Sequence, residues 1–425
     1  MSEITILSNA SSSLLASSYA GQGPDRSEYI YSMDRSTVNK HVSKFVKVPF
    51  NNPNFGESQS VEIPSFGVLN RMMLRFELTM HNDAEDTDIY DSLYAKLIDE
   101  CAIMNSSRRV FTLPGEMIAY LTHQLKREKK EKYLLAGMEK RIYNEIGQAL
   151  QIVNNAGDLG SQTLVVYTPL WFSCFEEGGA KSGPLMSNFN TRFIEKLSLM
   201  VRLNDISHFG SNASLTLSKM DLLCDFHIIE QKELNKIEEA NYSLSQNLAQ
   251  VMSDFVTVKS SPTAYTDAAI GIPIQLFNTQ LVHSIIVTLK RQDKGDKNGH
   301  FGIKAIKLSS AGRVLYETTN MWESQMLGGE DVYGHNNLDF DIIPYGSERH
   351  DWSQFAVIPF ANSVCDTSKI AGCCAFKNLN SVKLEVIPNN PTHATDAYVA
   401  TAYVRYYQAI ATSAQSGRIS ISLSS

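Results

Sequence analysis

The chain has 425 residues, of which 43% are hydrophobic and 20% charged, which is long enough for two compact units that each bury a core. Its net charge of −7 and pI of about 5.8 leave no overall basic surface, which argues against direct nucleic-acid binding. No apolar run approaches the ~20 residues of a transmembrane helix, and residues 1–23 lack the basic start and apolar run of a secretory signal. We therefore expect no transmembrane segment, an unsecreted chain, and a loose arm over residues 1–40.

Alternating residues predict strands along most of the chain. In "RMMLRFELTM", residues 71–80, every even-numbered residue is apolar, so one face is expected in a core while the other is wetter. In "KMDLLCDFHII", residues 219–229, the even-numbered residues are again apolar, whereas Asp221, Asp225 and His227 are expected on the wetter side. Turn-rich pieces separate the strand-like segments, as in an all-β protein. Similar segments lie at 45–50, 197–203, 282–291, 381–388 and 397–410.

Two helices are expected to interrupt the strands. One, near 115–136, follows Pro114 and has apolar residues on one face with mixed Lys and Glu on the rest. The other, near 231–255, is polar enough to run across a surface, and the segment 258–271 after it is short of large apolar residues, as in a connector. Two units with strands of similar kind then follow one another without a repeat at the level of residues.

Known chemical motifs are not matched. The loop "GGAKSG" (178–183) differs from a phosphate-binding loop because Ala180 separates Lys181 from the glycines, and "KGDKNGHFG" (294–302) lacks the carboxylates of a calcium loop. The ten histidines form no HxH or HExxH pattern, His350 and Asp351 are expected at the surface, and no GxSxG occurs. We expect no catalytic, cofactor-binding or metal site, no cofactor, and no enzymatic activity.

Aromatic residues and cysteines are expected to pack rather than react. Trp171, Phe172 and Phe175 form an aromatic run that could line a ligand groove but is more often core packing in a β-rich protein. The adjacent pair Cys373 and Cys374 has no CxxC partner for zinc. Reduced thiols that act as small hydrophobes fit the scattered positions best. The six cysteines are Cys101, Cys174, Cys224, Cys365, Cys373 and Cys374.

Taken in order, these segments resemble the double jelly-roll major capsid proteins of large eukaryotic DNA viruses and related smaller viruses. The first half carries similar pieces in "KFVKVPFNNPNFG", "PSFGVLNRMMLRFELTM" and "LIDECAIMNSSRRVFTLPGEMIAYLTHQL". The family's P-x-x-F-W-F strand, loop and Leu-Pro-like turn are resembled by "TPLWFSCFEEGGAKSGPLMSNFNTRFIEKLSLMVRL", and "MDLLCDFHIIEQKELNKIEEANYSL" is similar to the strand and acidic helix that end the first roll. The hairpin glycines of the family are replaced by Asn105, Ser106 and Ser107.

The second half continues the resemblance to about residue 423. "IQLFNTQLVHSIIVTLKRQD" and "FGIKAIKLSSAGRVLYE" are similar to the strands that open the second roll, and "FAVIPFA", "CCAFKNLNSVKLEVIP" and "AYVATAYVRYYQAIATSAQSGRISIS" to those that close it. The resemblance implies an all-β fold of two consecutive eight-stranded jelly rolls with short helical insertions. The boundaries expected are 1–40 for the arm, 41–256 for the first roll with both helices, and 257–425 for the second roll.

The resemblance also implies a function. The chain is expected to be a major capsid subunit whose homotrimers form pseudo-hexagonal capsomers that tile an icosahedral virion shell, with neighbouring capsomers and minor capsid or cement proteins as partners. Localisation would be the virion, with assembly in the host cell, expected in the cytoplasm. Two alternatives stay open, a minor capsid or host-attachment (glycan-binding) protein, and a carbohydrate-binding or enzymatic β-sandwich outside capsids.

Overall fold

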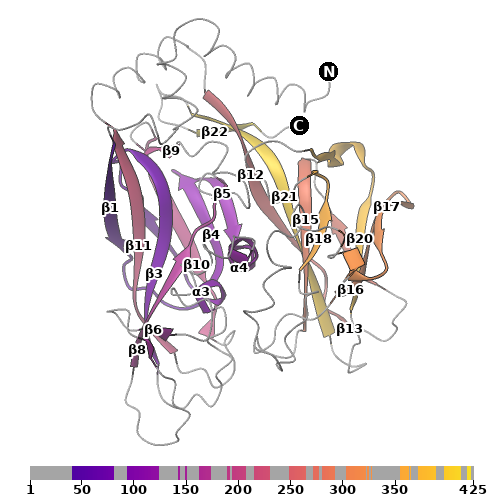
Figure 1. Cartoon of the computed structure of the whole chain (residues 1–425), viewed down its shortest axis with the longest axis horizontal. Coiled ribbons are helices and arrows are strands. Elements are labelled where there is room, and N and C mark those ends of the chain that lie inside the picture. Colours follow the sequence, from indigo (N-terminus) through magenta and orange to yellow (C-terminus); the bar gives the residue numbers. More distant parts are fainter. Residues whose placement is uncertain are drawn as a thin grey trace, which may run out of the picture.

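The computed structural model describes the strand-rich parts of the chain (Figure 1). Within those parts, no helix is long and apolar enough to cross a membrane. The expected arm over 1–40, the loops at 178–183 and 294–302, and His350 and Asp351 lie outside the described residues. The described residues are 41–80, 93–123, 142–143, 149–150, 162–173, 189–191, 194–206, 215–229, 248–264, 271–276, 280–291, 303–321, 323–324, 327, 355–362, 364, 372–388, 397–412 and 419–422.

The first unit contains two antiparallel sheets with four main strands each. One sheet has the order β1-β11-β3-β8, with β9 also paired to β3, and the other has the order β2-β10-β4-β5. Their side chains meet between the sheets in one apolar core. The bounds are β1 (His41–Pro49), β2 (Ser58–Glu62), β3 (Val68–Met80), β4 (Ile98–Asn105), β5 (Arg108–Pro114), β8 (Gln162–Pro169), β9 (Phe189–Asn190), β10 (Leu197–Leu203) and β11 (Leu215–Ile229).

The second unit repeats this plan. One sheet has the order β12-β21-β15-β18, with β13 and β22 also paired to β21 and β19 to β15, and the other has the order β14-β20-β16-β17. The bounds are β12 (Leu248–Lys259), β13 (Thr263–Ala264), β14 (Ile272–Leu276), β15 (Leu281–Arg291), β16 (Ile303–Ser310), β17 (Arg313–Thr318), β18 (Ala356–Pro359), β19 (Cys374–Ala375), β20 (Val382–Pro388), β21 (Ala397–Thr412) and β22 (Ile419–Ser422).

The two units have the same topology. When the main strands of either unit are numbered one to eight along the chain, its sheets run 1-8-3-6 and 2-7-4-5. This is the order in which a jelly roll places its strands in two facing sheets. The prediction of two consecutive eight-stranded rolls is confirmed, and their likeness is one of structure, because the sequence carries no repeat.

The helical predictions are partly corrected. Helix α4 (Gly115–His123) begins where expected, and the rest of the predicted helix near 115–136 lies outside the described residues. The predicted helix near 231–255 is wrong over 248–255, because β12 occupies these residues and pairs along its whole length with β21. Pairing to a long neighbouring strand overrides the polar, helix-like composition there. The other short elements are α3 (Leu93–Lys96), β6 (Ile142–Tyr143), β7 (Ala149–Leu150) and the 3-10 turn η8 (Phe376–Asn378).

The strand β12 also bears on the boundary between the rolls. The expected division between residues 256 and 257 falls inside β12, which belongs to the second unit by its pairing with β21. The last strand of the first unit ends at Ile229. The strands of the second unit therefore start at Leu248, earlier than the sequence pattern indicated.

Faces predicted from the period of two are mostly as expected. The apolar residues Met72, Leu74, Phe76 and Leu78 of β3 are buried. On β11 the predicted wetter face is wrong for Asp221, whose side chain is fully buried. It is stabilised there by two cations, because Oδ2 lies 2.9 Å from Lys47 Nζ and 3.3 Å from Arg75 Nη1, on the strands to either side.

Gly115 fixes where α4 starts. A Cβ at this position would lie 1.8 Å from the carbonyl oxygen of Ile98 on β4. We expect Gly115→Ala to lower the free energy of unfolding by about 3 kcal/mol, because backbone must shift to relieve the overlap. Gly312→Ala is the matched control, since its Cβ meets open space and only the positive φ of 81° costs, about 1 kcal/mol. Urea denaturation of both variants tests this, and equal losses would contradict it.

Candidate functional site: the joint between the two rolls

The two rolls meet where a sheet edge of the first lies against a sheet edge of the second. Strand β5 ends the order β2-β10-β4-β5, strand β12 starts the order β12-β21-β15-β18, and the two contact each other. Figure 1 shows β5 and α4 on the side of the first roll that faces β12 and β21. We call this surface the joint, formed by β5 and α4 on one side and β12, β15 and β21 on the other.

Hydrogen bonds cross the joint between its two edges. The backbone N–H of Thr112 on β5 donates to Asp254 Oδ1 on β12 at 2.7 Å. The buried amide of Gln408 on β21 donates from Nε2 to the carbonyl oxygen of Val110 at 2.9 Å. Each bond satisfies a backbone group of an edge strand that would otherwise need water. The edge of β5 is therefore covered by side chains of the second roll.

Glu116 in the first turn of α4 is the main polar anchor of the joint. Its Oε2 accepts hydrogen bonds from Tyr403 on β21 at 2.5 Å and from Thr288 on β15 at 3.1 Å. Its Oε1 lies 2.5 Å from Lys290 Nζ, also on β15. One carboxylate thus holds the start of α4 against two adjacent strands of the second roll. Burial, followed by the nearby Glu116 charge, raises the pKa of Tyr403 well above its ordinary value, so Tyr403 stays a donor.

Apolar packing also runs across the joint. Met252 and Phe255 of β12, Ile286 of β15 and Tyr403 of β21 belong to the same buried cluster as the core of the first roll. The remaining core of the second roll forms a separate cluster between its own sheets. Because a shared cluster must be broken to part the rolls, the joint is a continuous piece of protein interior.

The aromatic run found in the sequence helps to fix α4. Trp171 and Phe172 are buried just after β8, as predicted for core residues, and Phe175 lies outside the described residues. The indole Nε1 of Trp171 donates to Thr122 Oγ1 of α4 at 2.8 Å. The run therefore holds the helix that carries Glu116.

The structure describes four of the six cysteines, and their surroundings favour the protonated thiol. Cys101 and Cys224 are buried, and burial raises the pKa of the Cys224 thiol to about 12, which leaves it protonated. Cys373 and Cys374 are partly exposed, and all four thiols are free. Cys174 and Cys365 lie outside the described residues. Among the residues described, no group of three or more His, Cys, Asp or Glu side chains is arranged to hold a metal ion.

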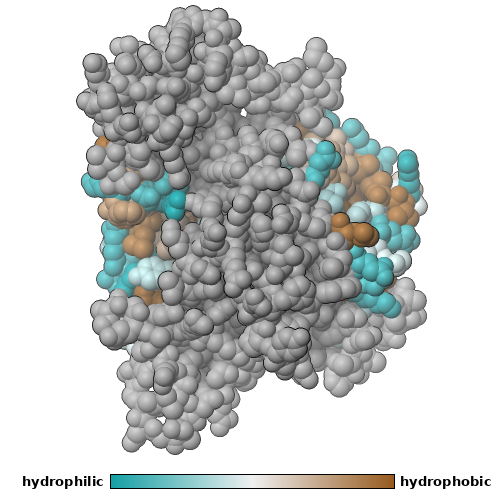
Figure 2. Space-filling model, viewed as in Figure 1, coloured by the Kyte–Doolittle hydropathy of each residue, from teal (hydrophilic) through white to brown (hydrophobic). Residues whose placement is uncertain are grey.

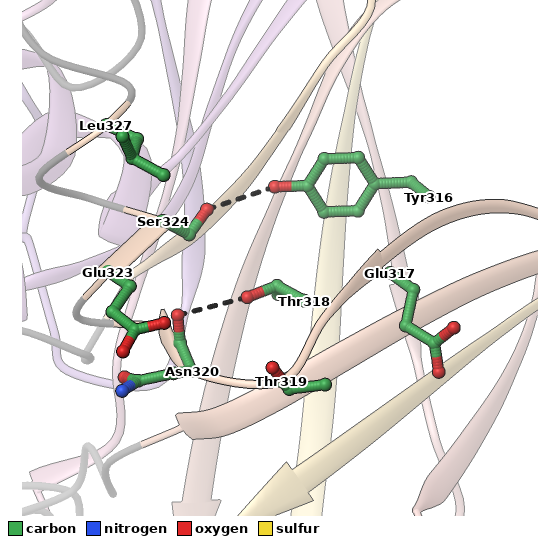
Figure 3. Close-up of a pocket in the computed structure, with 8 residues that line it drawn as sticks. All are labelled: Tyr316, Glu317, Thr318, Thr319, Asn320, Glu323, Ser324 and Leu327. Atoms are coloured by element: carbon green, nitrogen blue, oxygen red, sulfur yellow. Dashed lines mark hydrogen bonds between the residues drawn. The ribbon is translucent and has the colours of Figure 1, made fainter.

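A polar hollow lies on the far side of the second roll, at the end of β17. Its volume is about 600 Å³, and Figure 3 shows Tyr316 reaching Ser324 and Thr318 reaching the backbone of Asn320 across it. These hydrogen bonds measure 3.2 and 3.1 Å. The lining residues, mostly hydroxyl and carboxylate bearing, are Tyr316, Glu317, Thr318, Thr319, Asn320, Glu323, Ser324 and Leu327.

The comparisons with solved structures agree with this architecture. A chain of the PBCV-1 virus capsid has a TM-score of 0.62 at 12% identity, covering 91% of this chain and 98% of its own length. The 425-residue chain therefore has the double jelly-roll fold. Faustovirus major capsid protein shares the fold with a TM-score of 0.54 at 8% identity, over 97% of this chain and 99% of its own. A chain in the structure of the Sputnik virophage has a TM-score of 0.51 at 10% identity, covering 95% of this chain and 92% of its own length. No protein-family model and no curated protein matches the sequence.

The groups that make this double jelly roll one body were not predicted. Glu116, Asp254, Thr288 and Tyr403 carry no local motif, and the partners of Glu116 lie 172 and 287 residues away. Only the position of Glu116 at the start of a predicted helix was visible in the sequence. A polar residue there is ordinary at a helix N-terminus, so the pattern alone does not indicate a partner.

Removing the Glu116 carboxylate should weaken the joint. We expect Glu116→Ala to lower the free energy of unfolding by about 2 kcal/mol, because Lys290, Thr288 and Tyr403 lose their shared acceptor while the site is only about four-fifths buried. Glu385→Ala, which breaks the more exposed surface pair with Lys383, is the control and should cost less than about 1 kcal/mol. Denaturant unfolding measures both, and an equal effect would contradict the role of Glu116.

Asp254 should make the joint sensitive to pH. Burial raises its pKa from 3.8 to about 7, against hydrogen bonds from the Thr112 and Phe255 N–H groups and the Tyr406 hydroxyl and against the Arg109 charge, all of which lower it. Because the folded value lies above the unfolded one, protonation stabilises the folded chain; this stability is present below pH 4 and is lost as pH rises through 7.

The variant Asp254→Asn keeps an acceptor for Thr112 but does not titrate. We expect its stability relative to the unchanged protein to rise between pH 5 and pH 8, by up to about 3 kcal/mol. Asp99→Asn makes the same change at a more exposed carboxylate, which is paired with Arg202, and is the matched control. Melting temperatures at four pH values measure this, and parallel curves for Asp254→Asn and the unchanged protein would contradict it.

Proposed function

We propose that the chain is the major capsid subunit of an icosahedral virus and that three copies form a capsomer of six rolls with a pseudo-hexagonal outline. One observation carries this proposal: two rolls of identical strand order are joined side by side into one body. A hexagonal block needs six similar units, and three such chains supply them. The likeness to capsid proteins of PBCV-1 and Faustovirus supports the same reading.

A major capsid subunit acts through its contact surfaces. A heterologous contact closes the trimer, and weaker lateral contacts join it to neighbouring capsomers and to minor capsid or cement proteins. The chain would act in the virion after assembly in the host cell, in the cytoplasm, without catalysis or a cofactor.

The solution mass tests the proposal. We expect light scattering to give about three times the 47.4 kDa mass of the chain, and negative-stain images of that peak to show a pseudo-hexagonal outline. A chain that stays monomeric under every assembly condition would contradict a major capsid role. A minor capsid or attachment protein would instead be recognised by low copy number in purified particles, or by glycan binding of the isolated chain.

A further inference from the structure

The outermost strands of the molecule are the counterparts of the strands that meet at the joint. At the joint the fifth strand of the first roll, β5, lies against the first strand of the second, β12. The fifth strand of the second roll is β17 and the first strand of the first roll is β1. Figure 1 places β1 and β17 at opposite ends of the long axis. A fifth strand therefore contacts a first strand once within the chain. A second first strand, β1, and a second fifth strand, β17, lie on the outer flanks.

Strand registers match β1 to β12 residue by residue. Phe45 pairs with Asp225 of β11, which pairs with Arg71 of β3. Phe255 pairs with Arg405 of β21, which pairs with Ser284 of β15. The third strand of each roll, β3 or β15, has a register shift directly before the paired residue. The residue skipped is Asn70 in β3 and His283 in β15. Because a bulge marks a fixed position in a sheet, Phe45 is the counterpart of Phe255, and Lys44 is the counterpart of Asp254.

The β16–β17 hairpin likewise matches the β4–β5 hairpin. Each has a two-residue turn, and in each the register skips one residue of the fifth strand, Val110 in β5 and Leu315 in β17. The next residues, Phe111 and Tyr316, are paired again. Leu315 is therefore the counterpart of Val110. One residue further on from the aromatic pair, Glu317 is the counterpart of Thr112.

Apolar residues that are buried at the joint have exposed counterparts on the flanks. Phe255 is 5% exposed and Phe45 is 80% exposed, while Val110 is 1% and Leu315 37% exposed. Leu327, which lines the hollow next to β17, is 89% exposed. Figure 2 shows hydrophobic residues among hydrophilic ones on both outer flanks, over the ends where Figure 1 draws β1 and β17. Large apolar side chains at such positions are typical of surfaces that a partner covers.

The charges of the two flanks are complementary. Asp254 at the joint accepts a hydrogen bond from the fifth strand at Thr112. Its counterpart on the flank is Lys44, an exposed cation held 3.8 Å over the Phe66 ring. The residue at the position of Thr112 is Glu317, whose exposed carboxylate lies 3.5 Å from Lys307 Nζ. The ammonium of Lys44 on β1 can donate to the carboxylate of Glu317 on β17. At the joint the acceptor, Asp254, lies on the first strand; on the flanks the first strand carries the donor.

We propose that the β1 flank of one chain docks onto the β17 flank of a second copy, with Phe45 against Leu315 and the rim of the hollow, and Lys44 facing Glu317. The contact repeats the geometry of the joint between chains. It rests on the proposed function, because it names the surface that closes the trimer, and a heterologous contact of this kind can propagate from copy to copy until the ring closes.

Charge exchange tests the contact on the full-length protein. Lys44→Glu and Glu317→Lys should each raise the protein concentration at which half of the chains are trimeric by about 10-fold, because like charges then face each other. The double variant should return it toward the starting value. Phe45→Ser should raise it at least as much while leaving the melting temperature of the monomer unchanged, since the ring is exposed in the single chain. Lys259→Glu, an exposed lysine on β12, is the control.

The outcomes separate the two proposals. If the unchanged protein forms no trimer, the proposed function fails. If it forms a trimer whose dissociation none of these variants changes, the function stands and the docking of β1 on β17 is overturned. It is also overturned if the variants form normal trimers but no longer assemble into shells, because the flanks would then bind neighbouring capsomers.

Discussion

Covering one sheet edge with another is the constraint on which this molecule depends. An edge strand presents unpaired N–H and C=O groups, and here Asp254 of β12 and Gln408 of β21 bind such groups of β5. The apolar cluster behind them continues from one roll into the other. Glu116 then fixes the angle of approach, because it binds two neighbouring strands at once. Two rolls with facing sheets are thereby joined into one body.

The sequence predicted the strands well, because their signal is local. Alternation along β3 and β11 depends only on which residues face a core, and that face is the same whatever the partner strand. The predicted helix over 248–255 failed for the opposite reason, because β12 is stabilised by pairing with β21, about 150 residues later in the chain. The predicted exposure of Asp221 was wrong for the same reason. The buried carboxylate is stabilised by cations on the two neighbouring strands, Lys47 and Arg75, which the local pattern does not reveal. The sequence pattern did not predict the joint, because the hydrogen bonds that form it join residues far apart along the chain.

The β4–β5 hairpin forms a two-residue turn without glycine. Asn105, Ser106 and Ser107 stand in place of the family's glycines, and Ser106 adopts a φ of 56° that is unusual for a residue with a side chain. The cost is offset because Asn105 donates from Nδ2 to the carbonyl oxygen of Glu195, and the Ser106 N–H donates to that of Lys196. The turn thus keeps β5 in register with β4, and the register decides which residues reach the joint.

In the proposed docking of β1 on β17, one geometry serves two contacts of different strength. Within the chain the contact between fifth and first strands buries Phe255 and Val110 and forms with the fold, so it gains from a continuous core. On the flanks the corresponding positions combine exposed apolar residues with Lys44 and Glu317, which remain solvated in the single chain. A contact rich in charge gives specificity and faster association more than raw affinity, and its strength falls with salt. Subunits with a permanent inner joint and reversible outer flanks can correct a misplaced neighbour without unfolding.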